Sequence, residues 1–446
     1  MSRKYFGTDG IRGRVGVFPV VPEFAMKLGY AVGKVLGTKD KSVALIGQDT
    51  RRSGFMLSSA MSAGFSAAGV DVINVGVMPT PAIAYLTRKY GAQLGVVISA
   101  SHNPFYDNGI KLFSDGGEKL PDDVELEIER LIDSDTVLAP SEKVGSYHDK
   151  DDAIDLYAQF CINALGQVGL DLSGIKVVVD CAQGAMYKVA PKVLQSFGAE
   201  IIQIFASPNG MNINEGCGAV HTEKLQQAVL DNRADVGIAF DGDGDRLMMV
   251  DKTGTVVDGD AILYVIANQS KLKGDFSGGV VGTVMTNLGV EMAFNRCDIP
   301  FARAKVGDRY VFEIMKQKKW VLGGEASGHV ICYDVNTTGD GLIAALRVLR
   351  AVQSSGKDLH EILSEVIKVP QCMINVPLSR KANDADLAAL QCDVEAVEER
   401  LLDKGRVVLR PSGTEPVLRV MVEAVDGLIA KQEAEYLVNC VKDKIN

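Results

Sequence analysis

The chain contains the segment Val96-Val97-Ile98-Ser99-Ala100-Ser101-His102-Asn103-Pro104, in which an apolar run stops at a group of polar residues. A continuous apolar run is typical of a strand buried on both faces, and the Asn-Pro pair forces the chain out of the strand into a turn. Ligands of open α/β sheets bind just beyond the carboxyl ends of strands, so we expect Ser101 and His102 to face a crevice. Taken alone, the segment also fits an ordinary turn in which Ser101 satisfies nearby backbone donors.

Three parts of the chain repeat one pattern, in which a strand, a helix and a second strand are followed by a further helix and a third strand. The first strands are expected at 43–47, 176–180 and 279–283, the helices around 55–68, 193–197 and 290–295, the second strands at 69–75, 198–204 and 299–304, and the third strands at 94–98, 236–240 and 320–324. Each third strand ends in unusual polar sequence: SASHNP, DGDGDR and EASGH. We therefore expect three α/β domains whose polar strand ends line one cleft.

The last part of the chain follows a different pattern, with strands at 373–377, 406–409 and 417–422, a helix over 384–402 and a helix to the end. This pattern is typical of a small α+β domain. The predicted fold class is therefore α/β, with three repeated α/β domains that have mixed sheets, a smaller C-terminal α+β domain, and an active site in the central cleft. A length of 446 residues is too great for one core, and we expect domains at 1–150, 151–255, 256–370 and 371–446.

The composition excludes several classes of protein. Hydrophobic residues make up 47% and charged residues 23% of the chain, as in ordinary globular proteins, and the formal net charge is −10. That charge argues against nucleic acid or an anionic membrane as a partner, so an anionic ligand needs a local basic pocket. The N-terminal sequence lacks a signal-peptide core and no stretch approaches the ~18 apolar residues of a spanning helix, so we expect a cytoplasmic protein. The eight cysteines are scattered without zinc-site spacing and are expected to be reduced and mostly buried.

The aspartates of DGDGDR are candidate metal ligands. Asp241, Asp243 and Asp245 alternate along what we expect to be an extended loop, so their carboxylates can turn toward one hard cation. An EF-hand is excluded, because Arg246 and Lys252 stand where that loop needs glycine and an acidic ligand. Mg²⁺ held by carboxylates and a phosphate oxygen fits better, with Arg246 beside it for phosphate; the alternative is a solvated acidic turn.

Ser101 lacks the G-x-S-x-G surroundings of a hydrolase nucleophile, so acyl transfer is not expected. Next to a metal cluster, a serine is better suited to carry a phosphate, which brings about −1.5 to −2 charges that Mg²⁺ partly neutralises. His102 and Lys111 can supply proton transfer or charge stabilisation, although each also fits a surface or packing position.

Three further segments offer polar groups for a ligand. Glu325, Ser327 and His329 combine an acceptor, a hydroxyl and an imidazole, a set suited to sugar hydroxyls; the alternative is a polar loop with one core histidine. Arg12 lies in the glycine-rich start FGTDGIRG, which also fits a tight turn. A dianion could be held by the residues of the last loop, which also fits an ordinary polar hairpin: Arg410, Ser412, Gly413 and Thr414.

The ordered motifs SASHNP, DGDGDR, GEASGH and RPSGTEP closely resemble those of the α-D-phosphohexomutase superfamily, across the whole chain. The segments FGTDGIRG and ISASHNPFYDNGIKLF resemble its glucosamine branch more than its phosphomannomutase/phosphoglucomutase branch. The resemblance implies conversion of glucosamine 6-phosphate to glucosamine 1-phosphate, on the route to UDP-N-acetylglucosamine, peptidoglycan and lipopolysaccharide. One position departs from the glucosamine branch, which usually has glutamine where this chain has Ala326.

The resemblance also implies roles for single residues. Ser101 becomes the phosphoserine, which binds Mg²⁺ together with Asp241, Asp243 and Asp245. The implied catalytic residues are Ser101, His102, Lys111 and Arg12, and the implied substrate-binding residues are Glu325, Ser327, His329, Arg246, Lys305, Arg410, Ser412, Gly413 and Thr414. In the family mechanism the phosphoserine donates its phosphoryl group to a hexosamine phosphate, the 1,6-bisphosphate reorients, and its other phosphate returns to Ser101. A hexose 1,6-bisphosphate would prime the dephosphorylated enzyme, and a homodimer is compatible with the sequence.

Three other functions are weighed against this one. A phosphomannomutase or phosphoglucomutase would use the same mechanism on another hexose. A Mg²⁺-dependent sugar phosphatase would also explain DGDGDR, but it predicts release of free phosphate and no phosphoprotein. A non-catalytic sugar-phosphate sensor on the same scaffold predicts binding without isomerisation.

Overall fold

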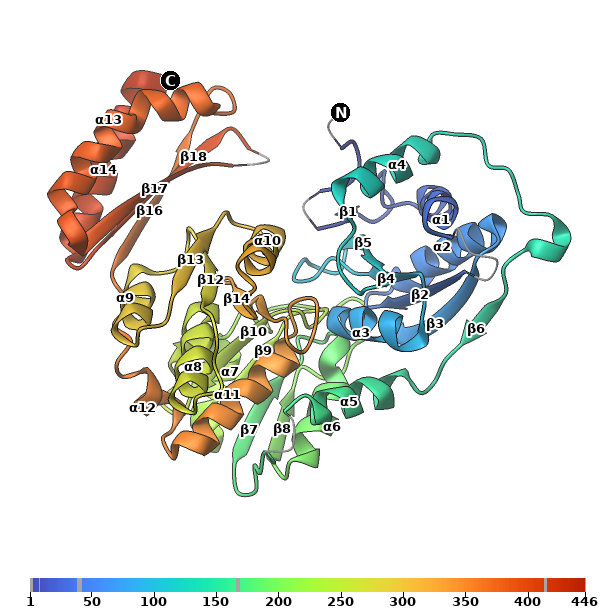
Figure 1. The fold of residues 1–446 in the computed structure, drawn as a ribbon, viewed down its shortest axis with the longest axis horizontal. Helices are drawn as coiled ribbons and strands as arrows, with labels where there is room; N and C mark the ends of the chain where they lie inside the picture. The colour runs from blue at the N-terminus through green and yellow to red at the C-terminus, as the bar shows by residue number, and fades with distance from the viewer. Residues whose placement is uncertain (1–2, 8, 38–41, 166–168, 413–414, 446) are drawn as a thin grey trace.

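The computed structural model describes residues 3–7, 9–37, 42–165, 169–412 and 415–445. Figure 1 shows three α/β parts that follow one another around the molecule, and a C-terminal part that stands apart from the N-terminal one. Each of the four parts is built on its own sheet. Within the described residues, no helix combines the length and the apolar character that crossing a membrane requires.

The first sheet has six strands in the order β1-β5-β4-β2-β3-β6. All five residues of β4 are buried, as expected for a strand covered on both faces. β4 pairs in parallel with β2 and antiparallel with β5, so the sheet is mixed. The elements of this part are β1 (Ile11–Arg14), α1 (Pro22–Leu36), β2 (Val43–Gln48), α2 (Gly54–Ala68), β3 (Asp71–Val77), α3 (Thr80–Tyr90), β4 (Leu94–Ile98), β5 (Asp107–Ser114), α4 (Asp122–Ile132), a 3₁₀ turn (Ser141–Lys143) and β6 (Tyr147–Asp149).

The second and third sheets have the orders β11-β10-β9-β7-β8 and β13-β12-β14-β15. The second part contains α5 (Ala153–Asn163), β7 (Lys176–Asp180), a 3₁₀ turn (Ala185–Tyr187), α6 (Val189–Ser196), β8 (Glu200–Ile204), α7 (Glu223–Asn232), β9 (Val236–Phe240), β10 (Leu247–Asp251) and β11 (Val256–Val257). The third contains α8 (Gly259–Leu272), β12 (Val280–Thr283), α9 (Leu288–Arg296), β13 (Phe301–Ala304), α10 (Asp308–Lys318), β14 (Leu322–Gly324), β15 (Val330–Cys332), α11 (Gly341–Ser355) and α12 (Leu359–Leu363).

The predicted internal repeat is present in the topology. Four strands follow the same order in each sheet: β5-β4-β2-β3, β10-β9-β7-β8 and β15-β14-β12-β13. The third strand of each repeat is parallel to the first and antiparallel to the strand after it. β14 is shorter than the predicted 320–324, because it begins only at Leu322. The domain limits at 150, 255 and 370 stay a prediction.

The C-terminal part is a three-stranded antiparallel sheet in the order β16-β18-β17 with two helices, which agrees with a small α+β domain. Its elements are β16 (Gln371–Pro377), α13 (Asp384–Leu401), a 3₁₀ turn (Leu402–Lys404), β17 (Gly405–Pro411), β18 (Val417–Ala424) and α14 (Gly427–Ile445). Asn383 caps α13, because its side chain accepts a hydrogen bond from the Asp386 N–H while the Asp386 carboxylate accepts one from the Asn383 N–H.

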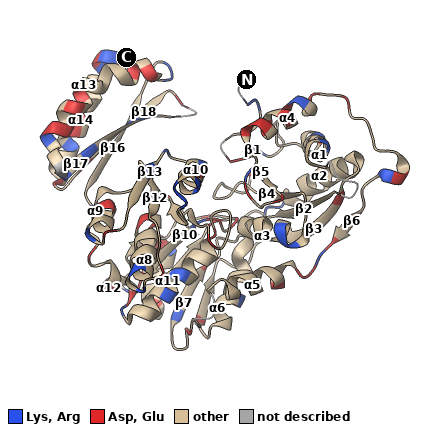
Figure 2. Ribbon diagram, in the orientation of Figure 1, with Lys and Arg blue, Asp and Glu red and all other residues tan. Residues whose placement is uncertain are grey.

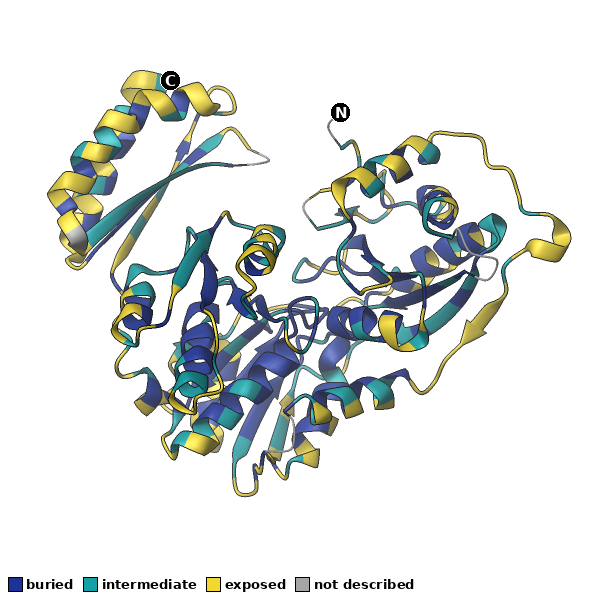
Figure 3. Ribbon diagram, viewed as in Figure 1, coloured by how far each residue is buried: buried dark blue, intermediate teal, exposed yellow. Residues whose placement is uncertain are grey.

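The buried apolar residues form one large cluster and several smaller ones. The largest cluster includes residues of the first three parts, such as Leu86, Ile238 and Leu346, and each of these parts also has a separate cluster of its own. The C-terminal part has its own core around Val420 and Leu437. Figure 3 shows buried helices α8 and α11 at the centre of the molecule and exposed outer faces on α13 and α14. All eight cysteines are free thiols. Four of them are buried, fewer than expected, and Cys392 is exposed on α13.

Candidate active site

The polar ends of the three repeated strands meet, as the repeat predicts. Ser101 follows β4, and its hydroxyl donates a hydrogen bond of 2.5 Å to Oδ2 of Asp241, which follows β9. Arg246, at the end of the same loop as Asp241, pairs through its backbone with His329, from the loop after β14. Because the three strands hold the same place in the repeated topology, their carboxyl ends face one centre (Figure 1).

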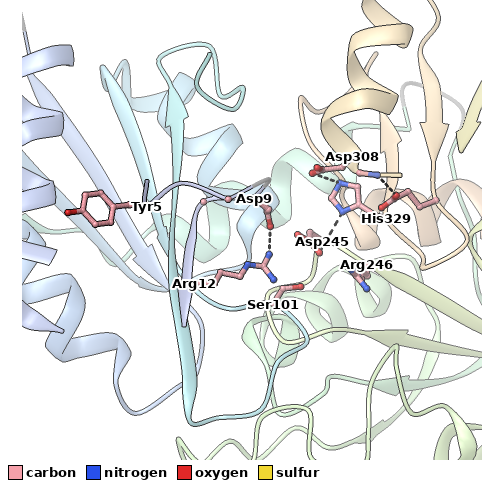
Figure 4. A pocket seen from close by; sticks show the side chains of 12 residues that line it. Tyr5, Asp9, Arg12, Ser101, Asp245, Arg246, Asp308 and His329 are labelled. Carbon is pink, nitrogen blue, oxygen red and sulfur yellow. Dashed lines mark hydrogen bonds and ion pairs between the residues drawn. The ribbon is translucent and has the colours of Figure 1, made fainter. Parts of the chain in front are cut away.

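The cavity at this centre has a volume of about 370 Å³ and is lined by residues from all three parts, among them Arg12, Ser101, Asp245, Glu325 and His329. Figure 4 shows Ser101 between Arg12 on one side and Asp245 with His329 on the other. Ser101 is 1% exposed and its backbone has a φ of 52°, in the left-handed region that serine rarely adopts. Nδ1 of His102 lies 3.3 Å from the Ser101 hydroxyl.

The acidic loop brings Asp241, Asp243 and Asp245 together, with one carboxylate oxygen of each within 4.8 Å of the others. The expectation of an extended loop is wrong: the loop is a turn that passes through Gly244 at a φ of 73°. The turn, rather than alternation along a strand, aims the three carboxylates at one point, and Gly244 supplies the left-handed backbone that it needs.

The donor set fits a divalent cation with oxygen ligands. All three aspartates are buried, and Oδ1 of Asp243 and Oδ1 of Asp245 have no hydrogen-bond partner among the described residues. Buried carboxylate oxygens are costly to leave unpaired, and carboxylates are the ligands that Mg²⁺ prefers. Burial, together with the neighbouring charges of Asp245 and Asp243, raises the pKa of Asp241 well above its usual value. A cation at this point would relieve that repulsion.

Lys111 is the buried counter-charge of the acidic loop. Its ammonium group lies 2.8 Å from Asp243, 3.0 Å from Asp245 and 3.2 Å from Asp9. Burial lowers the pKa of Lys111, but the charges of Asp243, Asp245 and Asp9 outweigh it and raise the pKa well above the usual value. Lys111 is therefore a fixed cation in this arrangement and is suited to charge stabilisation rather than to proton transfer.

The pKa values of the two histidines of the site are shifted in opposite directions. Burial and the charges of Arg246 and Arg12 lower the pKa of His102 to about 4. Burial also acts to lower the pKa of His329, but Asp245 and Asp308 outweigh it and raise that pKa above its usual value. The His329 ring nitrogens lie 3.7 Å from Asp245 and 3.5 Å from Asp308. His102 is thus neutral near pH 7, whereas His329 holds its proton more firmly.

Asp9 organises the N-terminal side of the cavity and was not predicted. Its carboxylate pairs with Arg12, Lys111 and Lys119, and Lys119 also pairs with Asp308 at the start of α10. The carboxylate stands inside the FGTDGIRG segment, three residues before Arg12. An acidic residue so close to a predicted catalytic arginine was the available signal.

A second cavity, of about 310 Å³, adjoins the first because Arg246 and Glu325 line both. Glu325 accepts a hydrogen bond of 2.9 Å from the Gly307 N–H, which fixes one carboxylate oxygen at the junction. Ser327, Ala326 and Arg410 also line the second cavity. The two cavities together lead from Ser101 to the C-terminal part.

Arg410 has a neighbour that the sequence analysis missed. Arg419 on β18 pairs directly with Arg410 on β17, and both line the second cavity. Burial and the charge of Arg419 lower the pKa of Arg410. Nε of Arg419 is buried without a hydrogen-bond partner in the described part of the chain. Two adjacent guanidinium groups at one cavity are suited to a dianion.

The remaining predicted site residues are Ser412, Gly413, Thr414 and Lys305. The Ser412 hydroxyl accepts a hydrogen bond of 3.3 Å from the Glu415 N–H in its own loop. Gly413 and Thr414 lie outside the described residues. Lys305 is exposed, with its ammonium group 5.9 Å from the Tyr310 ring centre, and it lines neither of the two cavities.

Comparison with known proteins agrees with this architecture. Models of the phosphoglucomutase/phosphomannomutase family match its alpha/beta/alpha domain I at residues 3–138, domain II at 155–254 and domain III at 258–369, and its C-terminal domain at 373–439. The chain belongs to this family. A Burkholderia thailandensis protein of the family has a similar solved structure, with a TM-score of 0.84 and 23% identity over 100% of this chain and 99% of that one.

Two relatives are similar over nearly their whole length. The phosphoglucosamine mutase of Pasteurella multocida (strain Pm70) is 53% identical over 441 residues, which cover 99% of each chain. Phosphoglucosamine mutase 2 of Shewanella sp. (strain MR-4) is 54% identical over 449 residues, which cover 99% of this chain and 100% of the relative.

Proposed function

We propose that this chain interconverts glucosamine 6-phosphate and glucosamine 1-phosphate through a phosphoserine at Ser101 and a glucosamine 1,6-bisphosphate intermediate. The observation that carries the proposal is the place of the Ser101 hydroxyl, buried in the cavity and 2.5 Å from the acidic loop. The shared name of the full-length relatives favours glucosamine over mannose or glucose as the sugar.

The acidic loop is the proposed metal site. Asp241, Asp243 and Asp245 would hold Mg²⁺ together with an oxygen of the phosphate on Ser101, and the bound ion would neutralise part of the phosphate charge. Lys111 stays charged beside the same carboxylates and adds a second positive charge. Arg12 and Arg246 line the cavity on two sides of Ser101 and would bind the transferring phosphoryl group.

The chemical step exchanges one ester bond for another. The bond between phosphorus and Ser101 Oγ breaks, a bond between phosphorus and the sugar hydroxyl oxygen forms, and the proton of that hydroxyl ends on Ser101 Oγ. His102 is the group that we assign to this proton movement, because it is neutral and lies 3.3 Å from Oγ. Return of the other phosphate from the bisphosphate to Ser101 reverses the same exchange.

The second cavity is the proposed site of the phosphate that does not react. Arg410 and its neighbour Arg419 would bind that phosphate, while Glu325 and Ser327 at the junction bind the sugar hydroxyls. His329 lies beside them at the first cavity. Because the bisphosphate must bind in two orientations, this region recognises phosphate and shared hydroxyls rather than one end of the sugar. Gly413, Thr414, Ser412 and Lys305 keep only the roles that the family resemblance implies.

The proposed mechanism also requires a source of phosphate for Ser101 and a use for the product. A hexose 1,6-bisphosphate would prime a dephosphorylated Ser101, and closure of the C-terminal domain would exclude water from the phosphoserine. The product would feed synthesis of UDP-N-acetylglucosamine for peptidoglycan and lipopolysaccharide in the cytoplasm. A homodimer remains a prediction.

The test compares three sugar phosphates with the protein primed by glucose 1,6-bisphosphate in Mg²⁺. We expect turnover of glucosamine 1-phosphate to exceed that of mannose 1-phosphate and glucose 1-phosphate, without release of inorganic phosphate. Faster turnover of mannose or glucose 1-phosphate would identify the alternative mutase. Release of inorganic phosphate in step with substrate loss would identify a phosphatase instead.

A further inference from the structure

The backbone around Ser101 is held by an unusual set of hydrogen bonds. Nη2 of Arg51 donates to the carbonyl oxygens of Ser101, at 3.1 Å, and Asn103, at 2.5 Å. Nδ2 of Asn214 donates to the same two oxygens, at 2.9 Å and 3.0 Å. We call Arg51 and Asn214 the carbonyl clamp. Neither residue is among those that line the two cavities.

The donors and acceptors of the carbonyl clamp match in number, whereas Nε of Arg51 and Oδ1 of Asn214 are buried without a hydrogen-bond partner among the described residues. The two NH₂ groups carry four protons, and the two carbonyl oxygens offer four lone pairs, so each donor serves both carbonyls and each carbonyl is saturated. Arg51 is among the largest fully buried side chains, and its charge is balanced by the equally buried Asp49. Asn214 is 8% exposed. Two buried donors from distant parts of the sequence thus hold one short turn.

The turn needs to be held, because Ser101 has a φ of 52°. An L-residue leaves the left-handed region unless its surroundings fix it there. Rotation about the N–Cα bond of Ser101 would move its hydroxyl away from Asp241, to which the hydroxyl donates a hydrogen bond. The clamped carbonyl belongs to the same residue, so the clamp controls the direction of the hydroxyl without contact to it.

The clamp also joins two domains. Arg51 follows β2 in the first part, whereas Asn214 belongs to the second part, where its N–H donates to the carbonyl of Ala182. Gly242 of the acidic loop lies directly against the clamp. A Cβ on Gly242 would come within 2.6 Å of the Ser101 carbonyl oxygen and 2.8 Å of Asn214 Nδ2. The turn at Ser101 and the acidic loop are therefore packed against one another at Gly242.

We propose that Arg51 and Asn214 are positioning residues, which hold the Ser101 backbone in its left-handed conformation so that the phosphoryl group on its hydroxyl is in line for transfer. The inference rests on the proposed phosphoserine mechanism and adds to it two residues outside the cavity. Loss of one clamp donor will slow phosphoryl transfer while sugar-phosphate binding is retained, because the groups that bind the sugar phosphate are unchanged.

The test measures single-turnover phosphorylation of dephosphorylated protein by glucose 1,6-bisphosphate in Mg²⁺, with quenching and mass spectrometry of the Ser101 peptide. Asn214→Gly removes the donor but keeps a residue that tolerates the left-handed φ of 59° at this position. Arg51→Lys is the second variant, which keeps the charge beside Asp49 but loses the planar fork. The matched control is Thr50→Val, which removes a hydrogen bond of 2.6 Å to the Gln183 carbonyl across the same domain interface.

We expect transfer to Ser101 to be at least about 10-fold slower in Asn214→Gly and in Arg51→Lys, since small misplacement of reacting groups can cost up to about 100-fold. Thr50→Val should transfer within about twofold of the wild-type rate, and the KM for glucosamine 1-phosphate should stay within about threefold in all three. Wild-type rates in both clamp variants, or equal slowing in Thr50→Val, would overturn the positioning role while the phosphoserine mechanism stands. A wild-type protein that never acquires phosphate on Ser101 would overturn both.

Discussion

At the scale of single residues, the site is a balance of buried charges. Three buried aspartates and one buried lysine lie together, with the partly exposed Asp9 beside them. Burial makes each unpaired charge costly, so each group depends on its partners. Function and stability are therefore coupled here, and a substitution affects both in a direction that depends on the charge removed.

Lys111→Met should reveal this coupling. It leaves the carboxylates of Asp243 and Asp245 without their cation, which we expect to cost roughly 3–5 kcal/mol of stability in the presence of EDTA. Mg²⁺ should then raise the midpoint of thermal unfolding more in the variant than in the wild type, because the ion replaces the lost charge. Thermal unfolding with EDTA and with Mg²⁺ checks this. An unchanged midpoint in EDTA would contradict the assigned role of Lys111.

Arg419→Met should separate stability from binding. Like charges directly opposite on paired strands are destabilising by roughly 0.2–1 kcal/mol, so loss of Arg419 beside Arg410 should leave stability unchanged or slightly higher. A charge-assisted hydrogen bond to phosphate contributes about 1.5–3 kcal/mol, so the KM for glucosamine 1-phosphate should rise about 10-fold or more. Steady-state kinetics beside a urea titration measure both effects. An unaltered KM would remove Arg419 from the phosphate site.

Residues whose side chains suggest a chemical role could be predicted from the sequence. Residues that act by holding the backbone in position could not. Ser101 and the three aspartates stood at strand ends, where a polar residue is informative. Asn214 and Arg51 carry no such signal, because their importance comes from two carbonyl groups that only the folded chain brings to them. Arg419 could have been inferred from strand register, since it stands opposite Arg410 across a short hairpin.

At the scale of helices and strands, the ends of the elements carry the function. The helix α8 begins beside the third part's contact with the C-terminal domain, and Asp260 in its first turn accepts a hydrogen bond of 2.9 Å from the Asn287 N–H. Burial and the nearby charge of Asp258 raise the pKa of Asp260 to about 7. The other oxygen of this carboxyl has no hydrogen-bond partner within the described ranges.

Asp260→Asn should therefore alter the pH dependence of stability. The folded protein holds the Asp260 proton up to a pH of about 7, whereas the unfolded chain releases it near pH 4, so this group's contribution is present below pH 4 and is lost as the pH rises through 7. The free energy of unfolding of Asp260→Asn minus that of the wild type should therefore increase by on the order of 2 kcal/mol from pH 5 to pH 8. Urea titrations at both pH values measure the gain, and the exposed Asp275→Asn serves as control. An equal difference at both pH values would contradict the assignment.

Element positions were predictable because the apolar runs are continuous and end at glycine, proline or acidic residues. The strand expected at 94–98 is β4, and the helix expected over 384–402 ends one residue earlier in α13. Local conformation was less predictable. The turn through Gly244 and the left-handed Ser101 depend on contacts between domains, which the pattern of one segment does not contain.

At the scale of the whole molecule, one large apolar cluster joins the first three parts, each of which also has a cluster of its own, and the C-terminal part has a separate core. Figure 2 shows acidic residues on α4 and basic residues on α10, and ion pairs join Asp122 to Arg309 and Glu118 to Lys316 across these two parts. The C-terminal domain is attached chiefly through Arg406 and the buried Glu423. We therefore expect this domain, rather than the other three, to move over a bound substrate.

Arg406→Met should loosen this attachment. Arg406 pairs with Glu423 and donates to the carbonyls of Val284, at 2.8 Å, and Thr286, at 2.7 Å. Its loss leaves Glu423 buried without its cation, so residues 364–370 should be cleaved faster by added protease and the KM for glucosamine 1-phosphate should rise. Arg400→Met is the control, because its pair with Glu433 lies within the C-terminal domain. Equal cleavage of the two variants would contradict an anchoring role.

The repeat made the large-scale architecture predictable, because three copies of one strand order imply three similar sheets with their carboxyl ends toward one centre. The sequence did not predict the shared core or the ionic contacts between parts, since these depend on surfaces that meet only in the folded molecule. The central claim joins all three scales, because Ser101 must receive and return phosphate at the meeting point of the domains.

The most direct measurement follows labelled phosphate on Ser101. Protein primed with labelled glucose 1,6-bisphosphate is isolated, its phosphopeptide is identified by mass spectrometry, and unlabelled glucosamine 1-phosphate is added. The label should be found on Ser101 and then pass to glucosamine phosphates rather than to water, and Ser101→Ala should take up no label and have no mutase activity. Label on another residue, label released as inorganic phosphate, or full activity in Ser101→Ala would contradict the mechanism.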